Sequence, residues 1–279
     1  MNTKTAERLH QIMCGPEQDI NLAEAALLIA SRVYPEFDIA DYVSRIDELG
    51  RTLRARLARD CKVAQRIQSL NAFLFQELGF APNTENYYDP RNSFLNEVIE
   101  RKVGIPISLS LLYMEIGQRA GLELYGVSFP GHFLVKCALS EGMVVLDPYS
   151  RGASLSLTDL QQRLRDHRGG EVSKAIVAGW LVAAGKKDIL ARMLRNLKAI
   201  YLQRREEQHA LHMLDAILAM TPESPEDLRD RGLVYQRLEC FRAATADLHA
   251  YLLRAPDAED AEEIGRRLDN LRRQHARLN

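Results

Sequence analysis

Apolar positions in the first quarter of the chain have the periodicity of an α-helix. From residue 22 to about 79 they recur at steps of three and four, and Gly50 and Gly79 stand where helices can end. The following segment, residues 81–93, is rich in turn formers and carries two prolines. The pattern therefore predicts a helical N-terminal region and then a loop that leads into a short helix over residues 94–101.

The hydropathy pattern changes at residue 104, where an almost wholly apolar stretch begins and continues to Ala120. Pro106 lies near its start, in the first turn, where a helix tolerates proline, and Gly121 follows its end. A helix without a polar stripe has no face suited to water. We therefore expect a buried helix here.

Three short runs with alternating or β-branched character come next, over residues 124–129, 132–138 and 143–146. Turn dipeptides, Pro130-Gly131 and Glu141-Gly142, separate them. This pattern predicts a small antiparallel sheet packed on the buried helix. A capped helix over residues 157–165 and a Gly169-Gly170 break follow, which predict one domain over residues 1–170 and a second over 171–279.

The second predicted domain contains an internal repeat with a period of 34 residues. At that offset Tyr201 corresponds to Tyr235, Ala210 to Ala244, Leu214 to Leu248, Leu218 to Leu252 and Pro222 to Pro256. This period resembles the tetratricopeptide repeat, in which stacked helix pairs share one continuous core. We expect an all-helical array of two units, a helix over residues 186–202 in the first unit, and a capping helix over 261–271.

Composition narrows the classes of function. Lys and Arg number 37 against 38 Asp and Glu, so no strong net charge attracts nucleic acid. The N-terminus lacks the apolar stretch of a signal peptide, and no run is long enough to span a membrane, so we expect a cytoplasmic protein without a membrane or nucleic-acid partner. Four scattered cysteines and unpaired histidines form no ligand motif, so we expect neither a metal nor a cofactor.

Three residues stand where an acyl-transfer site needs them. Ser108 lies at the start of the buried helix, His132 begins a strand, and Asp147 ends the next strand. A nucleophile at a helix N-terminus gains from the helix dipole, a histidine can take its proton, and an acid can orient the imidazole. Each residue also has a plain structural interpretation: a cap, a hydrogen-bonding histidine and a turn initiator.

The residues around these positions resemble the transglutaminase-like, papain-related superfamily, which has a cysteine at a helix start, then histidine, then aspartate before proline. The matching segments are residues 104–110, 131–135 and 146–148. Together with residues 190–197 and the repeats, they resemble the bacterial transglutaminase-like/TPR family of SirB type over residues 21–271. The resemblance implies an α+β, papain/transglutaminase-like core with a helical N-terminal extension, followed by an all-α tetratricopeptide-like region.

The nucleophile position, however, holds no cysteine. Ser108 is the residue that we align with it, and Ile107 or Ser110 are alternatives one or two residues away. Cys137 lies five residues after His132, so strand alternation points it to the opposite face of the sheet. A serine hydroxyl is a poorer nucleophile than a thiol at neutral pH.

Two hypotheses follow from this departure. In the first, the protein is an interaction or regulatory module: the residues Ser108, His132 and Asp147 are vestigial, and the helical repeats bind a protein or peptide partner. In the second, it is an amide or ester hydrolase or an acyltransferase, with Ser108 as nucleophile, His132 as base and Asp147 as the residue that orients the imidazole.

Overall fold

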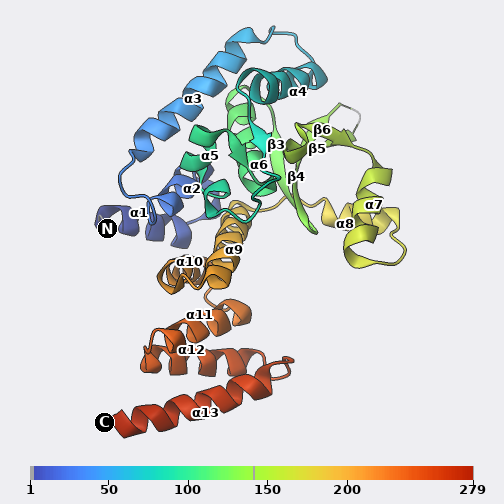
Figure 1. Cartoon of the computed structure of the whole chain (residues 1–279). Helices are drawn as coiled ribbons and strands as arrows, with labels where there is room; N and C mark the ends of the chain where they lie inside the picture. Colours follow the sequence, from blue (N-terminus) through green and yellow to red (C-terminus); the bar gives the residue numbers. More distant parts are fainter. Residues whose placement is uncertain (1–2, 141, 279) are drawn as a thin grey trace. The chain divides into compact units, whose positions relative to one another are not determined.

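The computed structural model describes residues 3–140 and 142–278. Its helices and strands in chain order are α1 (Thr3–Cys14), η1 (Glu17–Asp19), α2 (Leu22–Ala30), α3 (Ile39–Arg56), α4 (Val63–Asn71), η2 (Ala72–Glu77), β1 (Ala81–Pro82), η3 (Pro90–Asn92), α5 (Leu95–Arg101), β2 (Val103–Gly104), α6 (Pro106–Arg119), β3 (Leu124–Phe129), β4 (His132–Leu139), β5 (Gly142–Asp147), η4 (Pro148–Ser150), β6 (Ala153–Leu155), α7 (Leu157–Arg168), α8 (Lys174–Trp180), α9 (Lys186–Arg204), α10 (Glu207–Met220), α11 (Pro225–Arg237), α12 (Phe241–Arg254) and α13 (Ala261–Leu278). They form two compact units, residues 1–193 and 194–279. The expected α+β core followed by an all-α region is confirmed (Figure 1).

The first unit contains an antiparallel sheet of order β3-β4-β5-β6. The three longer strands match the predicted ones, and β6 is an addition that the sequence pattern did not indicate. It spans only three residues, too few for alternation to be recognised. A separate parallel pair, β1 and β2, joins the loop before α5 to the start of α6.

Helix α6 is the buried helix that the sequence predicts: every residue from Pro106 to Gly117 is buried. It contacts β3 and β4 of the sheet as well as α2, α3 and α5. Figure 1 shows it enclosed by the sheet and the N-terminal helices. The helical N-terminal region therefore covers a helix that has no face suited to water.

The two sides of the sheet carry different layers. Helix α6 packs on one side, where Gly117 leaves space for the side chain of Leu124. On the other side Leu134 forms an apolar cluster with α7 and α8 residues, including Leu164 and Val177. Alternation along β4 thus assigns successive residues to different layers.

The division between the two units lies at residues 193 and 194, later than the Gly169-Gly170 break at which we expected it. Helix α8 belongs with the sheet because Val177 is part of the apolar cluster on the side of the sheet opposite α6. The amide of Ala184 also donates to the carbonyl of Gly126 in β3. The glycine break is thus a turn between α7 and α8 within the first unit.

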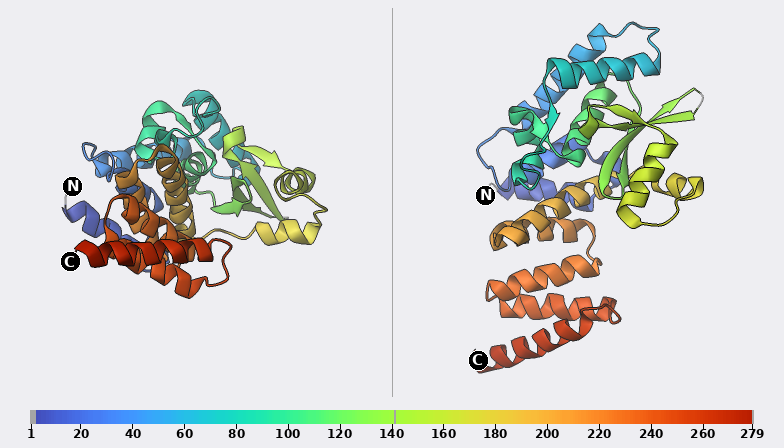
Figure 2. Two further views of the ribbon diagram at one scale, coloured as in Figure 1. Left: turned by 60° about the horizontal axis from the view of Figure 1, so that its bottom comes forward. Right: turned by 45° about the vertical axis from the view of Figure 1, so that its right-hand side comes forward.

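The second unit repeats the same local structure with the predicted period. Helices α10 and α12 begin and end 34 residues apart, at Glu207–Met220 and Phe241–Arg254. The turns before them share one hydrogen bond, from Glu206 N to Tyr201 O and from Cys240 N to Tyr235 O, both at 2.9 Å. Figure 2 shows the successive helices of this unit.

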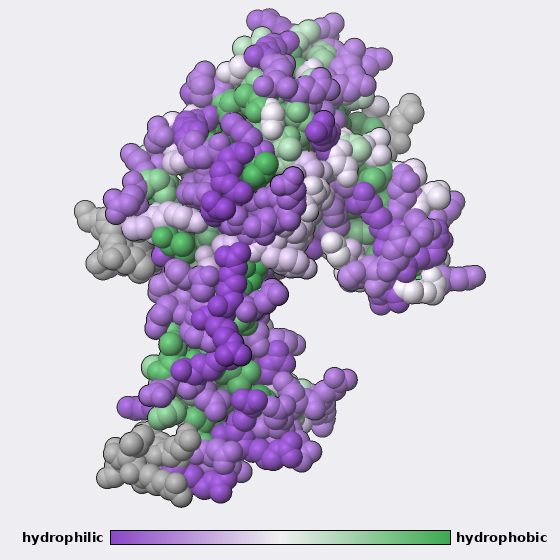
Figure 3. Space-filling model, viewed as in Figure 1, coloured by the Kyte–Doolittle hydropathy of each residue, from purple (hydrophilic) through white to green (hydrophobic). Residues whose placement is uncertain are grey.

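Hydrophilic side chains cover most of the surface in the view of Figure 3, and apolar ones are scattered among them. Among the described residues, no helix is both long enough and apolar enough to cross a membrane.

Candidate functional site

A tight hairpin places His132 at the start of β4. Gly131 has a φ of 68°, a conformation that favours glycine, and it closes the turn between β3 and β4. The guanidinium of Arg192, in the first part of α9, holds this hairpin because it donates to the carbonyls of Phe129 and His132. Burial lowers the pKa of Arg192. These contacts fix the backbone that carries the imidazole.

Asp147 is fully buried at the end of β5, and its carboxylate is saturated with donors. Oδ1 accepts from His132 Nε2 at 2.8 Å and from the amides of Tyr149 and Ser150. Oδ2 accepts from the Ser150 hydroxyl and from the Arg163 guanidinium, both at 2.8 Å. Burial by itself would raise the pKa of Asp147, but these hydrogen bonds outweigh it and lower the pKa to about 2. The carboxylate is therefore ionised throughout the physiological range.

The contact with Asp147 also fixes the chemistry of the His132 ring. A carboxylate can only accept, so Nε2 carries a proton, and in the neutral imidazole Nδ1 is left as an acceptor. The ring of Tyr149 meets that of His132 edge to face, with centroids 5.8 Å apart. The His132 side chain keeps 18% of its surface exposed. It is oriented, partly accessible and able to accept a proton.

A pocket of about 450 Å³ opens at this pair. Its lining combines the hairpin turn, the end of β5 and one face of α7, with the residues Pro130, Gly131, His132, Asp147, Tyr149, Ser150, Arg163, Asp166 and His167. The lining thus combines the Arg163 guanidinium and the imidazoles of His132 and His167 with the carboxylates of Asp147 and Asp166.

Ser108 lies elsewhere. Its side chain is fully buried, and its hydroxyl donates to the carbonyl of Asn92 at 2.6 Å while accepting from the amide of Ile105 at 3.1 Å. Ser110, the alternative, donates to the carbonyl of Phe133 at 3.3 Å. Within the described parts of the chain, no hydrogen bond joins either hydroxyl to His132. The structure therefore brings His132 and Asp147 together without Ser108.

The strand pattern explains the separation. His132 and Leu134 alternate onto the same side of β4, and Leu134 packs against α7 and α8. Cys137 lies on the other side, where its strand partner is Leu124, which touches α6. The histidine thus shares its side of the sheet with α7, whereas α6 packs on the opposite side.

The cysteines offer no replacement nucleophile at this pocket. Cys137 is buried, burial raises the pKa of its thiol, and none of the four cysteines lines the pocket. In the described residues no three His, Cys, Asp or Glu side chains cluster as a metal site.

The sequence analysis did not identify the pocket residues Tyr149 and Ser150, which follow Asp147, or the three that α7 contributes, Arg163, Asp166 and His167. In α7 a spacing of three and four residues places Arg163, Asp166 and His167 on one helical face. That spacing was available in the sequence, but only the structure shows that this face meets the end of β5.

Comparison with known proteins agrees with this architecture. Residues 40–195 match the transglutaminase-like superfamily, and residues 197–269 match the tetratricopeptide repeat. The chain is therefore a transglutaminase-like protein with tetratricopeptide repeats, a class whose repeats generally mediate protein interactions. No solved structure matches it.

Full-length relatives give the narrower assignment. A UPF0162 protein of Xylella fastidiosa (strain 9a5c) is 39% identical over 249 residues, 89% of each chain. A UPF0162 protein of Vibrio cholerae serotype O1 is 30% identical over 90% of this chain and 92% of its own. Protein SirB1 of Salmonella typhimurium is 24% identical over 90% and 92%. The chain belongs to the UPF0162 family, and the resemblance to SirB-type proteins is confirmed.

Proposed function

We propose that this protein is an interaction or regulatory module whose transglutaminase-like site binds a peptide or acyl group without turning it over. The observation that carries this proposal is the position of Ser108. Its hydroxyl is committed to Ile105 N and Asn92 O in a fully buried place, while His132 faces a different pocket. A nucleophile must lie within hydrogen-bond reach of its base, directly or through one water.

The His132–Asp147 pair has a binding role in this proposal. The Asp147 carboxylate holds the His132 ring in one orientation and also anchors Arg163 of α7. A ligand carbonyl or carboxylate that enters the pocket meets the Arg163 guanidinium, whose side chain is 32% exposed. In this role His132 and Asp147 do not catalyse a reaction; they hold hydrogen-bond donors in position for the ligand.

The rival function is a serine hydrolase or acyltransferase that uses Ser108, His132 and Asp147. It requires the Ser108 hydroxyl to leave both backbone partners and to come within hydrogen-bond reach of His132. The amide of Ile105 and the carbonyl of Asn92 would then each lose a hydrogen bond in a buried place. The cost is about 1–3 kcal/mol for each group.

The test is a turnover screen on purified wild type, Ser108→Ala and His132→Ala, with activated esters, amides and amine-plus-acyl-donor pairs. Circular dichroism first establishes equal folding. We expect no turnover above background in any of the three proteins. Turnover by wild type that disappears in both variants would establish the serine mechanism instead.

A further inference from the structure

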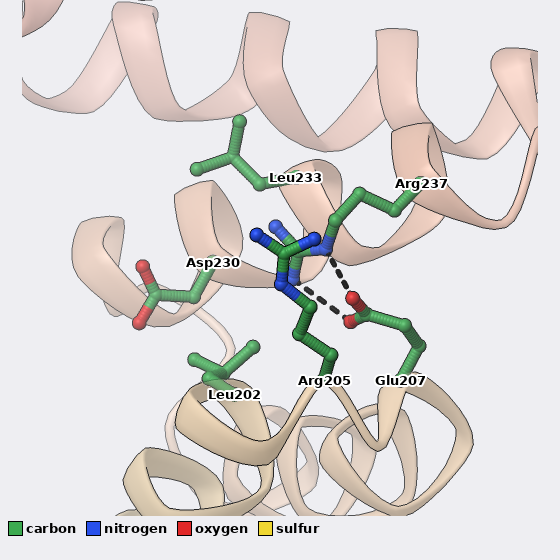
Figure 4. A pocket seen from close by; sticks show the side chains of 6 residues that line it. All are labelled: Leu202, Arg205, Glu207, Asp230, Leu233 and Arg237. Atoms are coloured by element: carbon green, nitrogen blue, oxygen red, sulfur yellow. Dashed lines mark hydrogen bonds and ion pairs between the residues drawn. The ribbon is translucent and has the colours of Figure 1, made fainter.

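A second pocket lies wholly within the helical repeats, in the unit that starts at residue 194. It has a volume of about 320 Å³ and is lined by Leu202, Arg205, Glu207, Asp230, Leu233 and Arg237. Figure 4 shows the guanidinium groups of Arg205 and Arg237 directed into the same space, with Leu202 and Leu233 on opposite walls. The pocket therefore combines arginine donors with two apolar side chains.

The acidic residues of this pocket are already paired. Glu207 accepts two hydrogen bonds from Arg237, at 2.6 and 2.9 Å. Asp230 accepts from Lys198 at 2.7 Å and from Arg229 at 2.9 Å. Arg205, in contrast, has no acidic partner for its guanidinium among the residues that the structure describes. It is the unneutralised cation of the pocket.

The backbone at Arg205 adopts a conformation that is uncommon for residues other than glycine. Its φ is 57°, in the left-handed region, and it is the residue immediately after α9. The hydrogen bonds from Arg205 N to Leu202 O and from Glu206 N to Tyr201 O form the helix-ending turn in which glycine is the favoured residue. Because glycine is the favoured residue in this conformation, Arg205→Gly removes the side chain without straining the turn.

The second repeat supplies a comparison at the same position. Glu239, 34 residues later, has a φ of 58° and lies in the same turn after α11. The backbone is therefore equivalent while the charge is opposite. Whatever the arginine contributes is specific to the first turn.

We propose that the pocket at Arg205 binds an acidic side chain, aspartate or glutamate, of an extended partner segment. The carboxylate accepts a bidentate pair of hydrogen bonds from Arg205, and an apolar neighbour in the segment packs against Leu202 and Leu233. This inference rests on the proposed interaction role of the repeats and assigns the partner chemistry to one pocket.

The test measures binding of a fluorescent, N-acetylated and C-terminally amidated peptide of alternating Glu and Leu to the full chain. Arg205→Gly should weaken binding about 10- to 100-fold because the charge-assisted pair is lost. The same variant should keep or raise the melting temperature, by up to about 4 °C, because glycine relieves the strained turn. Loss of binding without loss of stability separates a ligand site from a structural residue.

Two matched controls accompany the variant. Glu239→Gly relieves the equivalent turn and should leave peptide affinity unchanged. Arg242→Ala removes an exposed arginine of α12 that does not line the pocket, and it should change affinity less than twofold. The same peptide with Gln in place of Glu should not bind at the concentrations that saturate the Glu form.

Three results would overturn the inference: no binding of the Glu peptide to wild type, equal binding by Arg205→Gly, or equal binding of a Gln peptide that ends in a free carboxylate. The last result would assign the site to a chain terminus. None of these binding results changes the outcome of the turnover screen on Ser108 and His132. Failure of the peptide-binding inference can therefore be distinguished from failure of the proposed non-catalytic role.

Discussion

The hydroxyl of Ser108 occupies the third position of α6 and accepts a hydrogen bond from the amide of Ile105, the residue that caps the helix. This is the backward reach that Glu or Gln makes in a capping box. Gly104 is part of the same arrangement, because a Cβ there would lie 2.7 Å from the Ser108 hydroxyl. The serine, the glycine and the helix start therefore form one packed structural feature.

Ser108→Ala should lower the free energy of unfolding by about 1–3 kcal/mol, because it leaves the buried Ile105 amide without an acceptor. Ser110→Ala is the matched control, since Ser110 makes one long hydrogen bond from an equally buried place, and its loss should be smaller. Urea unfolding of the three proteins measures both values. A neutral Ser108→Ala would mean that the hydroxyl is not the cap.

Asp147 predicts a specific acid sensitivity. Its pKa is lowered from 3.8 to about 2 in the folded protein, so its carboxylate stabilises the fold above pH 4 and this contribution is lost as the pH falls toward 2. The difference corresponds to about 2 kcal/mol. Between pH 5 and pH 2, unfolding free energy should therefore fall by that much more in wild type than in Asp147→Asn. Parallel pH curves would show that the carboxylate is not held by His132 and Arg163.

At the scale of elements, the sequence predicted the strands because their alternation and turn dipeptides are local signals. It also identified His132 and Asp147, which lie on one side of adjacent strands. It could not indicate that α6 and α7 cover opposite sides of the sheet, because each helix has an apolar face that suits either side. For that reason the sequence analysis grouped Ser108 with His132 in one site and did not include Arg163.

The close packing of α11 on α12 gives a test of the repeat. A Cβ on Gly232 would lie 2.7 Å from the Leu248 side chain and 3.2 Å from its backbone nitrogen. Gly232→Ala should therefore cost about 1–3 kcal/mol. Gly265→Ala in α13, where nothing lies within 4 Å, should instead stabilise by up to about 1 kcal/mol. Thermal unfolding measures both, and equal effects would refute this packing.

At the scale of the whole molecule, the boundary between the two units does not lie where the sequence pattern indicated it. Glycine pairs usually indicate a break in structure, and Gly169-Gly170 does end α7. The boundary instead falls inside α9, a continuous helix that has no local signal of a division. The contacts of Val177, Ala184 and Arg192 with the sheet region place α8 and the start of α9 in the first unit.

Hydrogen exchange of Gly232→Ala tests this boundary in the full chain. Destabilising the repeats should increase exchange in α10–α13 and leave protection of α8 unchanged, because α8 opens with the sheet. If α8 lost protection together with the repeats, the division would lie at the glycine pair after all.

The central claim is that the Ser108 hydroxyl belongs to the helix start and not to a catalytic site. Intact-mass spectrometry after incubation with a fluorophosphonate tests it most directly, since this reagent forms a covalent adduct with serines activated by a neighbouring base. We predict unmodified protein after prolonged incubation at pH 7–8. An adduct on Ser108 that forms in wild type and is abolished in His132→Ala would contradict the account.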